Sequence, residues 1–219
     1  MKKTVYSLVL SEDVVHEIDK LAYQRGTNRS NMVNQILAEY ASLITPEKRM
    51  SHLLSEVRRH FEETTSFQLP EAASAGMMNL RTALRYKYNP TIRYSLELSR
   101  DGKSIGTLRV SLRTQNTQLV MAMVNFYGLW DTIETAFLGR QQSMVDGERY
   151  LRVLVLQSPT PQGLLLGSEA LGERIADYIV TFDTALKLYF SDPETNSRET
   201  KAKVERLYRD YFERRDVAV

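Results

Sequence analysis

The stretch that decides the fold is residues 4–43, TVYSLVLSEDVVHEIDKLAYQRGTNRSNMVNQILAEYASL. Residues 5–10 alternate in the two-residue period of a β-strand, with Leu8 and Leu10 on one face. Two apolar stripes at helical spacing follow, and Gly26 between them is a helix C-terminal signal. The predicted order is therefore strand, helix, short turn and helix.

These three elements cannot close a hydrophobic core by themselves. A lone strand leaves a row of backbone donors and acceptors unpaired, and about 40 residues bury too little surface to fold without help. Antiparallel pairing of two copies of the strand would satisfy those groups and bring four helices together. We therefore expect an isologous homodimer with one two-fold axis.

The residues LVLSEDVVHEIDKLA, followed by GTNRSNMVNQILAEY, resemble the ribbon-helix-helix DNA-binding domain of the CopG, Arc and MetJ type. The resemblance covers residues 1–44 and implies an intertwined dimer whose two-stranded ribbon reads base edges in the major groove of double-stranded DNA. The residues at the ribbon positions are Lys2, Lys3, Val5, Ser7 and Val9. The resemblance also implies a DNA phosphate anchor at the start of the second helix, at Asn28, Arg29 and Ser30.

The ribbon face departs from the family pattern. Members often place Arg, Lys, Asn or Gln there, whereas Ser7 is the one outward strand residue here that can hydrogen-bond. A good bidentate contact to a base contributes about 1–3 kcal/mol of discrimination, and this ribbon offers none. Sharp selection of a DNA sequence would therefore need DNA shape or other residues. The alternative is that the unit serves dimerisation alone.

The rest of the chain predicts a connector helix over residues 45–66 and a C-terminal α+β domain of unknown function over residues 67–219. The connector begins with a Thr-Pro helix signal and carries an apolar stripe. In the C-terminal domain, Asn116 or Thr117 caps a long apolar helix that runs through about Leu138 and is expected to be buried across a sheet, with Phe126 and Trp130 in the core. The expected fold class is thus a ribbon-helix-helix followed by a small antiparallel sheet packed on helices.

Three antiparallel strands are predicted in the first part of this domain, because turn dipeptides at Asn89-Pro90 and Asp101-Gly102 interrupt alternating runs. The first strand is expected to include Leu84, Tyr86 and Tyr88. Residues 139–149 are expected to form a loop, and residues 150–157 a buried strand.

Basic residues collect on the outward face of the predicted sheet. Residues 76–118 carry 8 Lys or Arg against 2 Asp or Glu, although the whole chain has 29 against 27. A solvated charged face is the plain interpretation, and a surface that binds DNA phosphate or another acidic ligand is the alternative. The candidate anion-binding residues are Arg85, Lys87, Arg93, Arg109 and Arg113.

The sequence gives no sign of a catalytic, metal or membrane-spanning element. The lack of Cys removes disulfides and thiolate chemistry, and the three histidines lack the spacing of a shared metal site. No apolar run approaches the roughly 20 residues of a membrane span, and no phosphate loop or nucleophile elbow is present. We expect a cytoplasmic protein that is not an enzyme and has no cofactor or bound metal.

These features predict a sequence-specific DNA-binding transcriptional regulator, and specifically a repressor. It would act as a homodimer that could assemble further on DNA, and its C-terminal domain would bind an unknown effector or protein partner. Two alternatives stay open. One is an accessory protein that organises the DNA of a mobile element or a partition system. The other is an antitoxin whose C-terminal region binds a toxin.

Overall fold

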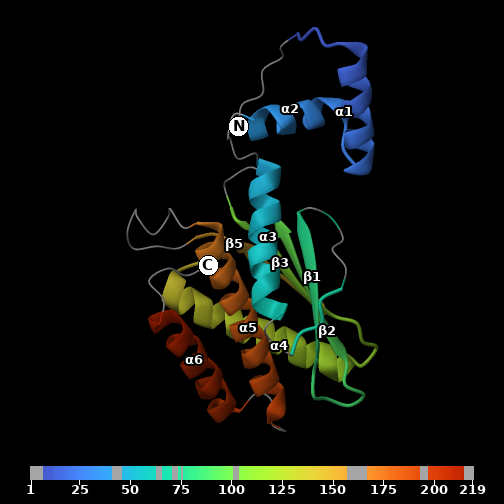
Figure 1. The fold of residues 1–219 in the computed structure, drawn as a ribbon. Coiled ribbons are helices and arrows are strands. Elements are labelled where there is room, and N and C mark those ends of the chain that lie inside the picture. Colours follow the sequence, from blue (N-terminus) through green and yellow to red (C-terminus); the bar gives the residue numbers. More distant parts are fainter. Residues whose placement is uncertain are drawn as a thin grey trace. The chain divides into compact units, whose positions relative to one another are not determined.

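The computed structural model describes residues 7–40, 46–62, 66–70, 74, 76–100, 104–156, 167–192 and 197–214. The chain divides into two compact units, Met1–Lys48 and Arg49–Val219. Figure 1 labels the helices and most of the strands.

The N-terminal unit contains two helices, α1 (Glu12–Gln24) and α2 (Arg29–Tyr40). Gly26 lies between them with a φ of 59°, a left-handed conformation that glycine adopts without strain. Asn28 caps the second helix, because its Oδ1 accepts a hydrogen bond from the N–H of Asn31 at 2.9 Å. A short capped turn therefore joins the two helices, as the sequence predicts.

The described part of the expected strand, residues 7–10, does not form a strand within one chain. Residues 7–10 lie outside any helix or strand, and residues 1–6 lie outside the described part of the chain. A β-strand needs a hydrogen-bonded neighbour, and both elements described in this unit are helices. A strand over residues 5–10 would therefore have to pair with another chain.

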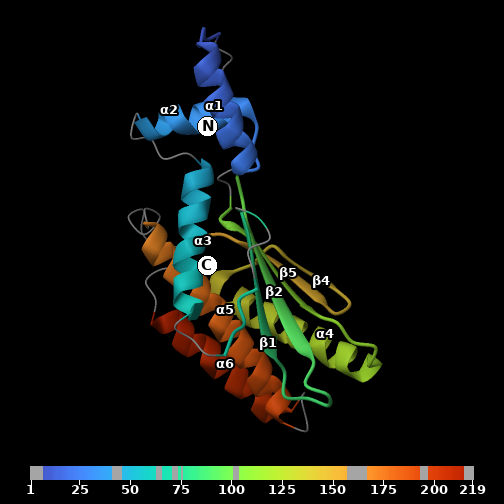
Figure 2. The same cartoon turned by 45° about the vertical axis from the view of Figure 1, so that its right-hand side comes forward.

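The C-terminal unit is an α+β domain built on a five-stranded antiparallel sheet, in the order β1-β2-β3-β5-β4 (Figure 2). Its strands are β1 (Met77–Ala83), β2 (Thr91–Leu98), β3 (Gly106–Leu112), β4 (Ser143–Asp146) and β5 (Arg149–Leu154). The first three strands follow one another as a meander, and the β4–β5 hairpin joins the sheet at the edge of β3. The expected α+β class is confirmed for this unit.

Four helices share a single hydrophobic core with one face of this sheet. They are α3 (Pro46–Glu62), α4 (Thr117–Leu138), α5 (Ser168–Ser191) and α6 (Arg198–Glu213). Alternate residues of β2 and β3 point into this core and are buried, while the residues between them face the other side. The sheet therefore has one covered face and one open face among the described residues.

Aromatic side chains fill the centre of this core. Phe182 of α5 has its ring centroid 5.0 Å from that of Trp130, 5.4 Å from that of Phe126 and 5.6 Å from that of Tyr150. Trp130 and Phe126 lie on α4 and are fully buried, which confirms their predicted place in the core. Aromatic contacts at these separations add to the burial of their area.

The first strand lies earlier in the chain than the alternating pattern suggested. β1 ends at Ala83, and Leu84 and Tyr86 belong to the connection to β2. Tyr88 and Asn89 have positive φ values of 66° and 43°, which breaks an extended backbone. The prediction of a strand through Leu84, Tyr86 and Tyr88 was therefore wrong.

A further strand forms where a loop was expected. Residues 143–146 form β4, which turns through Gly147 at a φ of 54° into β5. Asp146 lies opposite Arg149, so residues 147 and 148 make a two-residue hairpin turn. The strand expected over residues 150–157 is confirmed in part as β5, which begins at Arg149 and ends at Leu154, while residue 157 lies outside the described residues.

Helices α3 and α5 approach each other closely at Gly172. A Cβ atom there would lie 2.7 Å from the Cβ of Glu56 and 3.2 Å from the backbone nitrogen of Val57. We expect Gly172→Ala to lower the free energy of unfolding by about 1–3 kcal/mol, because the two helices would have to separate. Gly128→Ala on α4 is the matched control, since no atom lies within 4 Å of its added Cβ.

The control should raise the free energy of unfolding by up to about 1 kcal/mol, because Ala has the higher helix propensity. Urea denaturation measures both variants. Equal shifts in the same direction would contradict close packing at Gly172.

Candidate nucleic-acid interface

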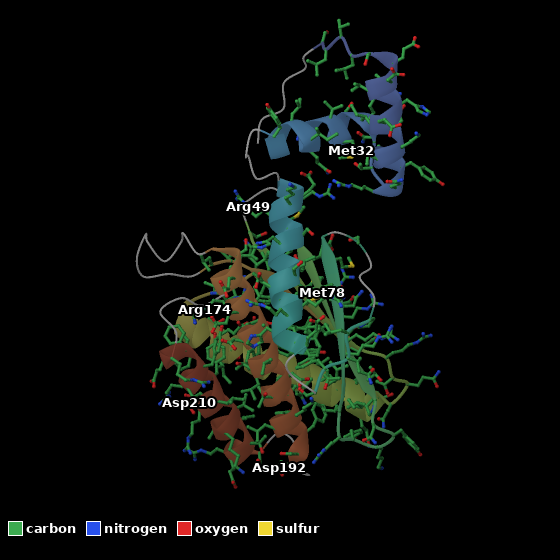
Figure 3. The ribbon with its side chains drawn as sticks, in the orientation of Figure 1. Met32, Arg49, Met78, Arg174, Asp192 and Asp210 are labelled. Carbon is green, nitrogen blue, oxygen red and sulfur yellow. The ribbon has the colours of Figure 1, made fainter. Side chains whose placement is uncertain are left out.

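The N-terminal unit buries few of its apolar side chains. In its described part the core consists of Ile18, Ala22 and Met32, and Met32 is labelled in Figure 3. Several larger apolar side chains of the same unit stay exposed; they are Leu8, Val9, Leu10, Val14, Leu21, Leu37 and Tyr40. Apolar surface gathered to this extent on so small a unit marks an interaction site.

The structure describes only some of the residues predicted to form the ribbon. Ser7 and Val9 are described, and both side chains are exposed in the single chain. Lys2, Lys3 and Val5 lie outside the described residues. The structure therefore leaves the side chains of Ser7 and Val9 accessible to a ligand.

The start of α2 brings Asn28, Arg29 and Ser30 together, and all three are exposed. The side chain of Arg29 is held by α1, since its Nε and Nη2 donate to the two carboxylate oxygens of Asp19 at 2.7 and 2.6 Å. This hydrogen bonding lowers the pKa of Asp19 and raises the pKa of Arg29. The guanidinium is thus fixed on its own unit.

What the start of α2 can offer a phosphate is mainly its backbone. The first N–H groups of any helix have no carbonyl partner within that helix, and the helix dipole makes this end positive. The hydroxyl of Ser30 lies in the same turn. A phosphate anchor here would use these donors, while the bidentate Asp19 pair keeps Arg29 in place beside them.

The second candidate surface is the open face of the sheet in the C-terminal unit. Arg93 on β2 and Arg109 on β3 lie on this face and are exposed, as the alternating pattern predicted. Arg113 follows the end of β3 and is also exposed. Arg85 and Lys87 are exposed but lie in the connection between β1 and β2, because β1 ends earlier than expected.

Two further arginines of this face were not predicted from the sequence. Arg81 of β1 lies opposite Arg93, and Ser111 of β3 lies between Arg93 and Arg149 of β5. Directly opposed residues share a face of a sheet, so one row crosses four strands. We call Arg81, Arg93, Arg109 and Arg149 the arginine face.

The sequence does contain signals that indicate Arg81 and Arg149. Arg81 was overlooked because the first strand was placed too far along the chain, whereas the alternation of Leu80, Arg81 and Thr82 already fits a strand. Arg149 was overlooked because residues 139–149 were interpreted as a loop. The Asp146-Gly147 dipeptide between two short alternating runs is a hairpin signal that would have located it.

The guanidinium groups of the arginine face form no ion pair and no side-chain hydrogen bond among the described residues. The same face carries two acids, Glu97 of β2 and Asp146 of β4, which lies directly opposite Arg149. Nitrogen-tipped side chains extend from the sheet on the side away from α3 and α5 (Figure 3). The open face therefore carries more positive than negative charge.

A buried polar network fixes β5, which carries Arg149, against the helices. Glu134 of α4 and Arg152 of β5 have no exposed side-chain surface, and Arg152 Nε donates to Glu134 Oε2 at 3.2 Å. Tyr150 and Tyr178 also donate to this carboxylate, at 3.2 and 3.0 Å. Burial raises the pKa of Glu134, and Arg152 opposes that rise. Because this network is closed to solvent, its role is structural.

A depression of about 240 Å³ lies between α3 and α5 and is lined by charged side chains. Its charges are paired, since Arg59 Nη2 lies 2.6 Å from Glu56 Oε2 and 3.1 Å from Glu169 Oε1. No group of metal-binding side chains occurs in the part of the chain that the structure describes. The depression therefore shows no anion- or metal-binding chemistry of its own.

Comparison of the chain with models of protein families, with curated proteins and with solved structures gives no match. None of the described helices combines the length and apolar character needed to cross a membrane. Any functional assignment therefore depends on the exposed apolar surface of the N-terminal unit, the start of α2 and the arginine face.

Proposed function

We propose that the protein is a homodimeric, sequence-specific DNA-binding transcriptional regulator whose N-terminal unit completes a ribbon-helix-helix fold with a second copy of itself. The observation that carries this proposal is the incomplete core of the unit. Its two helices bury only three hydrophobic residues in the described part of the unit, while a larger set of apolar side chains stays exposed.

A second copy supplies what this unit lacks. Burying a Leu side chain stabilises an interface by about 1.5–3 kcal/mol relative to leaving it exposed, and Leu8, Leu21 and Leu37 are all available for this. Ser11 has extended backbone angles, φ −67° and ψ 152°, which are ordinary for the residue that precedes a helix and allow an extended chain before α1. Antiparallel pairing of residues 5–10 between two copies would satisfy the backbone hydrogen-bonding groups of these residues. It would at the same time cover the exposed apolar surface of the N-terminal unit.

The paired ribbon would then present Ser7 and Val9, with Lys2 and Lys3 upstream, to the major groove. The N–H groups at the start of α2 in each copy would bind a phosphate on either side. Two-fold symmetry of the dimer favours a DNA site with two symmetric half-sites. Occupation of such a site within a promoter would repress transcription.

Leu37→Asp tests this proposal in the full-length chain. Leu37 is 54% exposed in the single chain, so the carboxylate is tolerated by a monomer but not by an apolar dimer interface. We expect the dimer to weaken at least about tenfold and DNA binding to fall with it. Light scattering measures the oligomeric state, and genome-wide footprinting measures the enriched DNA.

Tyr23→Asp is the matched control, because Tyr23 is 90% exposed and lies outside the apolar stripe of α1. This variant should stay dimeric and keep the footprint of the wild type. A wild-type chain that is monomeric, or that enriches no DNA, would contradict the proposal.

A further inference from the structure

The arginine face places its four guanidinium groups close together on one side of the sheet. Arg81 and Arg93 are direct neighbours on adjacent strands, which lie about 4.8 Å apart. Arg149 lies in the same row two strands away, roughly 10 Å from Arg93. Arg109 lies in the next row along β3, opposite Ser95.

This arrangement is unfavourable for the unit alone. Like charges directly opposite each other destabilise a sheet, and Arg81 opposite Arg93 is such a pair. Elsewhere in the chain Arg29, Arg59 and Arg209 each form an ion pair with an acid. The face carries both signs, since Glu97 and Asp146 share it, but the four arginines outnumber these two acids. The excess of positive charge therefore points to an anionic partner.

The side chains around the arginines suit phosphate oxygens. A guanidinium binds a phosphate with two parallel hydrogen bonds and is more weakly hydrated than an ammonium group. Ser95, Thr107 and Ser111 lie among the arginines on the same face, and their hydroxyls can also donate to phosphate. The face thus has the donors that nucleic-acid backbones engage.

The strands carry no exposed aromatic residue among the positions that the structure describes. Tyr94 of β2 and Tyr150 of β5 are fully buried on the opposite face. Proteins that bind single-stranded nucleic acids stack bases on exposed aromatic rings. A duplex, whose bases are already stacked and whose phosphates face outward, fits this surface better.

We infer that the open sheet face of the C-terminal unit binds the phosphodiester backbone of double-stranded DNA. This inference rests on the proposed function, to which it adds a second contact made by the same chain. Two linked binding modules raise the effective concentration of the second contact and so the overall affinity. The arginine face would supply affinity that is independent of base sequence, which the poor ribbon face lacks.

The test is a full-length variant with Arg81→Gln, Arg93→Gln and Arg109→Gln, titrated against a labelled duplex of about 30 base pairs, roughly three helical turns, of arbitrary sequence. At about 0.1 M salt its affinity should fall at least about tenfold. The slope of log affinity against log salt should become less negative by about 2 to 3, because three phosphate contacts are lost. Fluorescence anisotropy across a salt series measures both.

The matched control removes three positive charges from α6 by Arg198→Gln, Lys201→Gln and Arg206→Gln. These side chains are exposed, and none of them has an ion pair among the described residues. The control should keep the wild-type affinity and salt slope. A single Arg109→Gln variant, expected to reduce the slope by about 1, keeps the test decisive if the triple variant does not fold.

The outcomes separate this inference from the proposed function. A sheet variant with wild-type affinity and slope would overturn the inference, while loss of binding in Leu37→Asp would still support the N-terminal site. The reverse pattern, with binding lost in the sheet variant and retained in Leu37→Asp, would support the inference and contradict the N-terminal site. If the sheet variant loses affinity only for single-stranded oligonucleotides, the assignment to duplex DNA is overturned.

Discussion

Replacing Glu134 by Gln is expected to lower the free energy of unfolding of the C-terminal unit by about 3–5 kcal/mol. The carboxylate accepts hydrogen bonds from Arg152, Tyr150 and Tyr178, and both charged side chains are fully buried. Without the negative charge, the guanidinium of Arg152 would stay charged and buried with only neutral acceptors, among them Gln141 Oε1 at 2.8 Å. These acceptors offset less of its desolvation than a carboxylate does, which is the reason for the large effect.

Trp130 provides the measurement, because it is the single Trp of the chain and is fully buried in this core. Its fluorescence during chemical denaturation therefore reports on the C-terminal unit. Glu205→Gln is the control, since Glu205 pairs with Arg209 at 2.9 Å on the surface of α6. It should change the free energy of unfolding by less than about 1 kcal/mol.

The combined change Glu134→Leu and Arg152→Met should recover most of the loss, because apolar side chains can replace a buried ion pair at little cost. Equal effects of Glu134→Gln and Glu205→Gln would show that the buried pair does not stabilise the unit.

This network marks the limit of what the sequence could predict. The alternation of Tyr150, Arg152 and Leu154 places all three on one face of β5, but a charge within an apolar strand does not by itself indicate burial. The acid that pairs with Arg152 is Glu134. That pairing depends on where α4 lies against β5, a long-range feature that no local pattern contains.

The arginine face shows a different limit, because the sequence contained local signals for all four of its residues but two strands were placed wrongly. Arg93 and Arg109 were predicted because period-two alternation decides the face of each residue once a strand is located. Arg81 and Arg149 were not, because the row they complete depends on the ends of β1 and on the β4–β5 hairpin. The strand predicted over residues 5–10 is a separate case. In the proposed dimer it pairs with a second copy, so a single chain offers it no partner.

Lys187→Met is expected to lower the free energy of unfolding by about 2–4 kcal/mol at neutral pH. Lys187 Nζ lies 2.6 Å from Asp183 Oδ2 and donates to Thr82 Oγ1 at 2.6 Å. Asp183 is nearly fully buried and also accepts from the hydroxyl of Tyr94 at 2.8 Å. Methionine keeps a long apolar side chain near the ring of Phe67 but removes the cation that offsets the buried carboxylate.

The loss of unfolding free energy caused by Lys187→Met should depend on pH, because the buried carboxyl group of Asp183 titrates. Burial raises the pKa of Asp183, and the hydrogen bond and charge of Lys187 oppose that rise. Removing Lys187 therefore raises this pKa further above its value in the unfolded chain, which is about 3.9. A carboxyl group whose pKa is higher in the folded than in the unfolded chain stabilises the fold fully at pH values below its unfolded pKa. This contribution is lost as the pH rises through its folded pKa.

The deficit of Lys187→Met should thus be small below about pH 4 and grow towards neutral pH. Denaturation followed by Trp130 fluorescence at several pH values measures it. The control is Lys203→Met, whose partner Glu199 lies 2.7 Å away on the surface of α6 and whose effect should stay within about 0.5 kcal/mol. A deficit that does not change with pH would contradict this account, because it would mean that Lys187 stabilises the unit through Thr82 and Phe67 and not through Asp183.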